Sequence, residues 1–311
     1  MPTLDRNLLH RFGLLLVILL VGLALSLTTD TFLSVANFTN VARQVSINGI
    51  LAVGVTFVLL TAGVDLSLGS VVALSGVACA TFAHPGEHVV LVPIAVGLLT
   101  GTACGLMNGL LVTRGGVAPF IVTLGMMTIA RGLALIVSGG RPVANMSAEL
   151  TALSGDFLGI PIPVLFFIGV SIGAWYFLRN IRLGRHVYAV GGNENAARAA
   201  GIPVDRVKLV AYGLCGLLTG LAGVVLAARI TTGQPNAGQA YELDAIAAVV
   251  IGGTSLAGGI GTITGTLLGV LLIGIINNGL DLMGVSSYYQ AVIKGVIIVG
   301  AVWLDRRQAR S

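Results

Sequence analysis

The sequence predicts an all-α polytopic membrane protein with about ten transmembrane helices. Hydrophobic residues make up 56% of the 311 residues. Charged residues make up only 9%, against roughly a quarter in soluble domains. Apolar windows long enough to cross a bilayer recur along the whole chain. Because such a chain has too few polar side chains to cover a water-facing surface, we expect one membrane domain over residues 1–311.

Ten apolar windows are expected to span the membrane. They lie near residues 12–28, 46–64, 67–83, 89–112, 119–138, 162–178, 208–228, 243–256, 260–279 and 287–304. The first follows Arg6 and Arg11 and is similar to a signal peptide, but no small-residue cleavage site follows it. We therefore interpret it as a retained helix.

The distribution of positive charge predicts the orientation. With the N-terminus inside, twelve Lys and Arg residues fall in cytoplasmic segments and three fall outside, namely Arg43, Arg141 and Arg229. This asymmetry follows the positive-inside rule. An even number of spans returns the C-terminus to the cytoplasm. Acidic residues, including Glu242, are expected mostly outside. The net charge of +5 thus reflects topology and not nucleic-acid binding.

Two glycine ladders predict close helix packing, since small residues at i and i+4 let a second helix approach. The glycines are Gly97, Gly101, Gly105 and Gly109 in the fourth window and Gly261, Gly265 and Gly269 in the ninth. The ladders lie five windows apart in helices of opposite direction. They therefore also predict an inverted five-plus-five repeat, which many transporters contain.

Three motif matches do not amount to a catalytic, metal or nucleotide site. His84-Pro-Gly-Glu-His88 matches a zinc pattern, but its Pro-Gly pair breaks the helix that the pattern needs. The glycine-rich run at 251–262 lacks the Gly-Lys-Ser/Thr of a P-loop. The cysteines show no metal or disulfide spacing and are interpreted as small buried hydrophobes: Cys79, Cys104 and Cys215. We expect no enzyme, metal or cofactor here, with any ATP and magnesium held by a separate chain.

Polar residues within or beside the windows are candidates for function. Asp65 lies in TAGVDLSLGS at the inner end of the second window, and Arg131 and Lys294 lie inside the fifth and tenth. A charge at the bilayer centre costs at least about 2.5–3.5 kcal/mol, so each needs a partner or a water-filled cavity. One interpretation is a polar translocation path that also includes Asn277, Asn278 and Gln290.

The other interpretation is structural. Each charged residue would then belong to an ion pair or act as an interfacial anchor. For Asp65, the N-terminal end of the third helix offers a favourable capping position at the turn.

Residues 179–208 form a polar insert that holds six of the seventeen basic residues. Asn193 is expected to cap a helix over Glu194–Ala200, and Gly201 to end it. A helix of this length is unstable alone in water. It therefore predicts docking onto the membrane domain or onto a cytoplasmic partner, with a solvated loop as the alternative. The docking face would comprise three alanines flanked by a basic side chain: Ala196, Ala197, Ala200 and Arg198.

Five segments of the chain resemble the ribose-type ABC importer permeases. They are GILAVGVTFVLLTAGVDLSLGS, PFIVTLGMMTIARGLALIVSGGRPV, GRHVYAVGGNENAARAAGI, YELDAIAAVVIGGTSLAGGIGT and GVSSYYQAVIKGVIIV. The similarity runs from about residue 12 to 306, and YELDAIAAVVIGGTSLAGG is its most diagnostic part. The pattern is closest to permeases for ribose, while xylose, arabinose, galactose and autoinducer permeases share much of it.

The resemblance implies a bacterial inner-membrane protein that works as a pair of permease subunits with both termini cytoplasmic. A periplasmic binding protein would deliver the sugar, and a cytoplasmic ATPase with two fused nucleotide sites would drive import. Residues 184–201 would supply the coupling helix. The coupling residues would be Arg185, Asn193, Glu194, Ala196, Ala197, Arg198 and Gly201.

The expected function is therefore the membrane permease of an ATP-driven monosaccharide importer, with ribose as the first candidate. External loops, including residues 139–160, would dock the loaded binding protein, and the remaining partner would be lipid. The alternative is an ion-coupled secondary transporter in which Asp65 carries the coupling ion. An intramembrane enzyme is a third class, but the sequence offers no nucleophile, base and metal set for it.

Overall fold

The structure is a computed structural model that describes residues 6–310, with side chains over 12–297, 299 and 300. The chain is mostly helical, as predicted. The principal helices are α1 (Arg6–Thr28), α2 (Val35–Leu60), α3 (Leu68–Thr81), α4 (Leu91–Thr113), α5 (Pro119–Ser138), α7 (Ile162–Asn180), α8 (Arg182–Gly192), α9 (Glu194–Ala199), α10 (Val204–Ile230), α11 (Tyr241–Ile251), α12 (Ile263–Leu282) and α13 (Ser287–Arg310). The short elements are α6 (Ala148–Thr151), η1 (Ala152–Ser154), β1 (Asp156–Phe157) and β2 (Ile160–Pro161).

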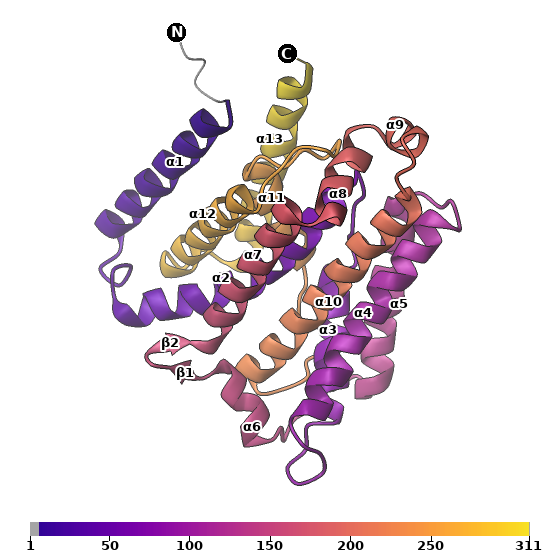
Figure 1. Cartoon of the computed structure of the whole chain (residues 1–311). Helices are drawn as coiled ribbons and strands as arrows, with labels where there is room; N and C mark the ends of the chain where they lie inside the picture. Colours follow the sequence, from indigo (N-terminus) through magenta and orange to yellow (C-terminus); the bar gives the residue numbers. More distant parts are fainter. Residues whose placement is uncertain (1–5, 311) are drawn as a thin grey trace.

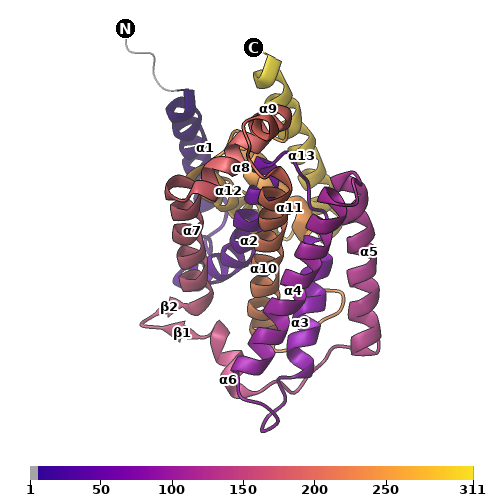
Figure 2. The same ribbon diagram turned by 45° about the vertical axis from the view of Figure 1, so that its right-hand side comes forward.

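The helices form one bundle with two distinct ends (Figure 1). The start of α1, the end of α13, and α8 with α9 lie together at what we call the α9 end. The β1–β2 hairpin and α6 lie at the opposite end, the hairpin end, as the turned view also shows (Figure 2). Six described helices are long and apolar enough to cross a membrane: α2, α4, α5, α7, α10 and α12.

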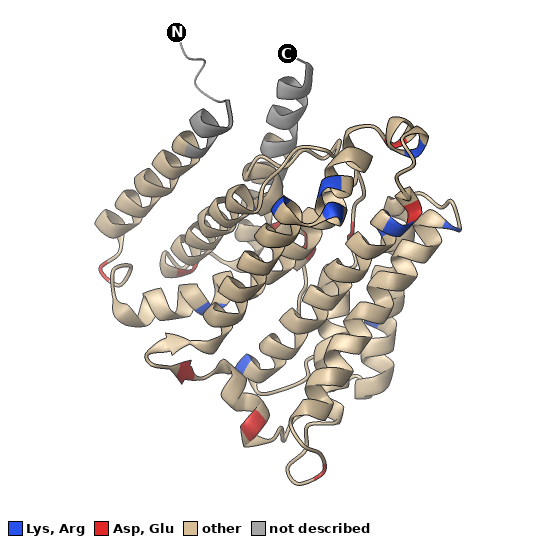
Figure 3. Ribbon diagram, in the orientation of Figure 1, with Lys and Arg blue, Asp and Glu red and all other residues tan. Residues whose placement is uncertain are grey.

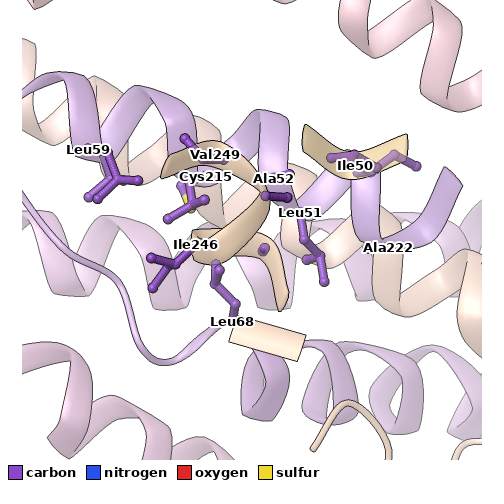
Figure 4. Close-up of a cluster of buried hydrophobic side chains, with 14 of the residues drawn as sticks. Ile50, Leu51, Ala52, Leu59, Leu68, Cys215, Ala222, Ile246 and Val249 are labelled. Atoms are coloured by element: carbon purple, nitrogen blue, oxygen red, sulfur yellow. The ribbon is translucent and has the colours of Figure 1, made fainter. Parts of the chain in front are cut away.

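Helix α2 forms the centre of the bundle. Every residue from Val45 to Leu60 is buried, and the helix packs against α7, α10, α11 and α12. Its side chains join those of α3, α10 and α11 in the largest apolar cluster (Figure 4). Outer helices show the reverse pattern, with large apolar side chains exposed: Leu16 and Leu20 on α1 and Ile121 and Ile136 on α5. An apolar outer surface is what lipid contact requires.

The predicted window at 46–64 begins too late, because α2 begins at Val35. Ser34 caps the helix there by accepting a hydrogen bond from the Asn37 N–H at 3.2 Å. The first turns carry Asn37, Asn40 and Arg43, which lower the hydropathy without ending the helix. Hydropathy windows detect lipid-like stretches and therefore miss a polar helical extension.

Two long helices are each followed by a non-helical segment and then a short helix. The 26-residue α2 leads through residues 61–67 to the 14-residue α3. The 27-residue α10 leads through 231–240 to the 11-residue α11. Each long helix is followed closely by a non-glycine residue with positive φ, Ala62 at 58° and Thr231 at 57°. Since α2 and α10 run in opposite directions (Figure 1), the two arrangements are inverted relative to each other.

The glycines of α4 bring this helix into backbone contact with α10. A Cβ atom on Gly101 would overlap the carbonyl oxygen of Gly216, and one on Gly105 would overlap that of Tyr212. Gly97 and Gly109 face Val224 and Leu209 of the same helix. The ladder therefore fixes the distance between two long helices that would otherwise be held apart by side chains.

In the second ladder, Gly265 and Gly269 of α12 press against backbone carbonyls of α11. The prediction that Gly261 belongs to this helix is wrong. The helix begins at Ile263, capped by the Thr262 hydroxyl, which accepts a hydrogen bond from the Gly265 N–H at 3.1 Å. Gly261 lies in the preceding loop, packed against the side chain of Thr254.

We predict that Gly101→Ala lowers the free energy of unfolding by about 1–3 kcal/mol, because overpacking forces α4 and α10 apart. The measurement is unfolding in mixed detergent with increasing dodecyl sulfate. Gly125→Ala in α5 is the matched control, because no atom lies within 4 Å of its added methyl group. Equal stability of the two variants would contradict the proposed contact.

Candidate translocation and coupling sites

The polar insert folds into two helices, and the first was not predicted. Helix α8 buries Gly184, Val187 and Val190 and exposes Arg182 and Arg185. Arg185 Nη1 donates to the Asn180 carbonyl at 3.5 Å. The signal was present in the sequence as apolar residues at helical spacing among arginines. It is shorter than a spanning window and therefore was missed.

Helix α9 has the predicted caps. The Asn193 side-chain oxygen accepts a hydrogen bond from the Ala196 N–H at 2.9 Å, and Gly201 follows the helix with φ of 79°. Ala196 and Ala200 are exposed, but Ala197 is only 5% exposed. Ala197 packs in a cluster with Val187, Val190, Val204 and Val207 of its own chain. The assignment of Ala197 to a partner-facing surface is therefore wrong, because adjacent helical residues point about 100° apart.

Four charged side chains attach α9 to the first turns of α10. Lys208 Nζ lies 2.6 Å from Glu194 Oε2. Arg198 Nη2 lies 3.3 Å from Glu194 Oε1 and 3.1 Å from Asp205 Oδ1. The hydrogen bond from Lys208 lowers the pKa of Glu194 below its ordinary value of 4.5. The stabilisation is therefore present above that ordinary value and is lost as the pH falls through the lowered pKa.

Asp65 closes a turn directly before α3. Its Oδ1 accepts hydrogen bonds from the Ser67 N–H at 2.8 Å and the Ser67 hydroxyl at 2.6 Å. Asn108 of α4 donates to the same hydroxyl at 3.1 Å. Asp65 is 2% exposed, and its geometry is that of an Asx turn leading into a helix. The structure thus gives this carboxylate a structural role at the turn before α3, but not the direct helix cap that was expected, since no side chain among the described residues caps α3 itself.

Glu242 is half-buried in the first turn of α11, so its assignment to an external loop is wrong. Its carboxylate lies against Gly69 in the first turn of α3, where an added Cβ atom would overlap Glu242 Oε2. Gly69 also lies against Gly238, which precedes α11. The N-terminal ends of α3 and α11 therefore meet within the bundle. Charge counting failed here because the chain re-enters the bundle after α10 and does not remain in a loop.

Arg131 anchors the non-helical segment that precedes α11. Its Nη1 donates to the Pro235 carbonyl at 2.5 Å and to the Ala237 carbonyl at 2.9 Å. Backbone carbonyls inside an apolar bundle need such donors, since lipid offers none. The guanidinium thereby supplies a partner to a non-helical stretch.

Lys294 forms a buried ion pair with a residue that the sequence analysis missed. Its Nζ lies 2.8 Å from Asp244 Oδ2, and Asn277 donates to the same oxygen at 3.2 Å. The Asp244 side chain is 6% exposed and that of Lys294 is 24% exposed. The three residues join α11, α12 and α13. The available signal was an acid within the apolar 243–256 window, in the first turn of a short helix.

The remaining candidates lie elsewhere. Asn278 and Asn37 exchange two hydrogen bonds, at 2.7 and 3.0 Å, which tie α12 to α2. The half-buried Gln290 donates to Asp281 at 2.8 Å and to the Val285 carbonyl at 2.9 Å. The six predicted path residues therefore do not form one polar line; only Asn277 and Lys294 come together, through Asp244.

A small cavity adjoins the Asp244 pair. Its volume of about 10 Å³ is no larger than a water molecule needs. The side-chain oxygen Oδ1 of Asn48, beside the cavity, is buried without a hydrogen-bond partner among the described residues. The cavity is too small for a monosaccharide. Its lining residues are Val45, Asn48, Asp244, Ala248, Val270, Ile273 and Gly274.

Comparison with known proteins identifies a family and several relatives. The family model for the branched-chain amino acid transport system permease component matches residues 37–302. Ribose import permease protein RbsC of Escherichia coli K12 is 48% identical over 94% of this chain and 93% of its own length. The protein of that name from Bacillus subtilis 168 is 47% identical over 97% and 94%. An L-arabinose ABC transporter permease of Azospirillum brasilense is 42% identical over 98% and 91%. No solved structure matches significantly.

We predict that Lys294→Met and Asp244→Asn each destabilise the protein, by about 3–5 kcal/mol for the lysine change, because removing one partner leaves a buried charge. The double variant should recover much of this loss. Unfolding free energies in detergent provide the double-mutant cycle. Tyr289→Phe on the same helix is the control, because Tyr289 is 70% exposed, and its change should stay within about 0.5 kcal/mol. Strict additivity of the two single changes would contradict the coupling.

Proposed function

Since the chain belongs to the family of branched-chain amino acid transport system permease components, we propose that it is the permease subunit of an ATP-driven monosaccharide importer, with ribose as its cargo. The observation that carries the proposal is the identity of nearly half of all residues, over almost the whole chain, with two ribose import permeases. The chain is a transport component and not an enzyme. We assign residues 1–311 to a single permease domain.

A separate ATPase would dock at α9. Asn193 and Gly201 define the ends of this helix, while Glu194 and Arg198 hold it against α10. Ala196 and the guanidinium of Arg185 remain exposed at the same end of the bundle. A short, capped helix that presents small side chains suits insertion into a groove of a partner. ATP and magnesium would be bound by that partner.

The α9 end would face the cytoplasm. The chain's basic residues gather around α8, α9 and the adjacent ends of α4 and α10 (Figure 3). The start of α1 and the end of α13 lie at the same end (Figure 1). Positive charge near membrane helices favours the cytoplasmic side. Both termini would then be cytoplasmic, in a multi-pass protein of the bacterial inner membrane.

Ten spans in an inverted five-plus-five repeat would account for the two interrupted passages, by which we mean α2 with α3 and α10 with α11. In this scheme α2 and α3 correspond to α10 and α11, and the glycine ladder of α4 corresponds to that of α12. The support is the shared order of long helix, positive-φ residue, non-helical segment and short helix in opposite directions. Broken helices of this kind meet near the bilayer midplane in many transporters.

Two copies of the chain would enclose the sugar path, and a periplasmic binding protein would deliver cargo at the hairpin end. The support there is a hairpin attached to α2: Arg43 contacts both carboxylate oxygens of Asp156, at 2.9 and 3.0 Å. Leu158 at the tip is 89% exposed. A hairpin with an exposed apolar tip is suited to contact a partner protein.

We predict that vesicles containing the permease, its ATPase and its binding protein take up ribose only when ATP is present on the side of the membrane that carries the ATPase. Collapsing the proton gradient should leave uptake unchanged, since Asp65 is engaged with Ser67 at a helix start. Labelled ribose uptake is the measurement, with xylose, allose and arabinose as competitors. Uptake without the ATPase, abolished by a protonophore, would instead support the ion-coupled alternative.

We predict that replacing Glu194–Ala199 with a Gly/Ser linker abolishes co-purification of the ATPase while the bundle stays folded. The reason is that the exposed face of α9 disappears whereas the long helices are untouched. Thermal unfolding in detergent checks the fold. Leu158→Ser at the opposite end is the control and should leave co-purification intact. An unchanged yield of ATPase with the linker variant would refute docking at α9.

A further inference from the structure

Three backbone segments meet at the end of α8. The Gly259 N–H donates to the Leu60 carbonyl, the last residue of α2, at 3.0 Å. Gly191 of α8 presses on the same point: a Cβ atom there would overlap the Leu60 carbonyl oxygen and lie 2.5 Å from the Gly259 nitrogen. Only a residue without a side chain fits between them.

The loop between α11 and α12 is shaped for this contact. Gly258 and Gly259 have φ values of 87° and 73°, a region that favours glycine. A Cβ atom on Gly258 would lie 2.8 Å from the Ala62 nitrogen and 2.9 Å from the Gly191 carbonyl oxygen. A second link joins α8 to the same loop, since the Tyr188 hydroxyl donates to the Gly261 carbonyl at 3.1 Å.

The junction connects α8 to both interrupted passages. Leu60 ends α2 and leads through residues 61–67 to α3. The loop at 252–262 follows α11 and leads into α12. Residues 191 and 192 are followed directly by the Asn193 cap of α9. A displacement of α8 and α9 must therefore move the chain at the C-terminal ends of α2 and α11, because close-packed backbone atoms cannot approach further.

We propose that the contact of Gly191 with Leu60 and Gly259 is the junction through which movement of α8 and α9 reaches the short helices α3 and α11. The inference rests on the proposed ATP-driven function. Gly191 is then a positioning residue: it touches neither sugar nor ATP. It links ATP hydrolysis on the partner to rearrangement of the two passages.

A purely structural glycine and a coupling glycine differ in what they change. Loss of structure lowers yield, ATPase binding and transport together. Loss of coupling leaves assembly and hydrolysis in place but lowers the number of sugars moved per ATP hydrolysed. The ratio of uptake to hydrolysis is therefore the informative measurement.

The chain offers a matched pair of variants for this test. Gly191→Ala introduces the methyl group into the junction, whereas Gly192→Ala places one where no atom lies within 4 Å. Both are compared with the unsubstituted permease in vesicles with the ATPase and binding protein. We expect Gly191→Ala to lower sugar uptake per ATP about tenfold, within the usual range for coupling between sites. The ATP hydrolysis rate and the amount of co-purified ATPase should both stay within about twofold of the unsubstituted values, below the usual coupling range. Gly192→Ala should behave as the unsubstituted protein.

A gentler variant decides the question if Gly191→Ala does not fold. Tyr188→Phe keeps the ring and removes only the hydrogen bond to the Gly261 carbonyl, so uptake per ATP should fall about two- to fivefold. Tyr176→Phe, an exposed tyrosine on α7, is its control. Uptake per ATP equal to the unsubstituted value in Tyr188→Phe and in folded Gly191→Ala would overturn the junction. Failure of the unsubstituted protein to import sugar with ATP would contradict the proposed function first, and the junction's role with it.

Discussion

The need to satisfy backbone groups inside an apolar bundle determines much of this structure. Residues 61–67 and 231–240 are not helical, so their N–H and carbonyl groups lack intrahelical partners, and lipid cannot replace them. Side chains supply what is missing. Arg131 donates to two carbonyls of the second segment, and Tyr212 donates to the Val64 carbonyl of the first at 3.1 Å. Asp65 accepts from the Ser67 N–H directly before α3, and the Glu242 carboxylate lies against Gly69 in the first turn of that helix.

This constraint changes the meaning of the intramembrane charges. An ionisable residue in a span is by default a candidate for cargo or ion binding. Here Arg131 and Asp65 stabilise non-helical backbone, and Lys294 is paired with Asp244. Lys294 and Asp244 offset each other's charge. Arg131 and Asp65 are already engaged by carbonyl groups and by Ser67. Such an interior suits an uncharged, hydroxyl-bearing cargo, whereas an ion-coupled carrier would need a carboxylate free to exchange its ion.

The sequence predicted those features that depend on local patterns. The window at 119–138 coincides with α5 because Pro119 and Gly139 mark its two ends. In the same way, Asn193 and Gly201 predicted the ends of α9. Features that depend on packing between distant segments were not predictable. The burial of Glu242 depends on a re-entrant chain, and the pairing of Asp244 with Lys294 joins residues fifty positions apart. The start of α2 was missed because Asn37, Asn40 and Arg43 lower the hydropathy of its first turns without ending the helix.

The two attachments of the α8–α9 unit differ in stiffness, which determines where force from a partner would go. The Glu194, Arg198, Asp205 and Lys208 network is largely exposed, and exposed ion pairs contribute only about 0–1 kcal/mol each. It can rearrange while α9 moves along α10. The glycine junction consists of backbone atoms at contact distance, which cannot approach further. Movement of α9 would therefore change its side-chain contacts with α10. At Gly191 the same movement would displace the backbone of Leu60 and Gly259, and with it the two interrupted passages.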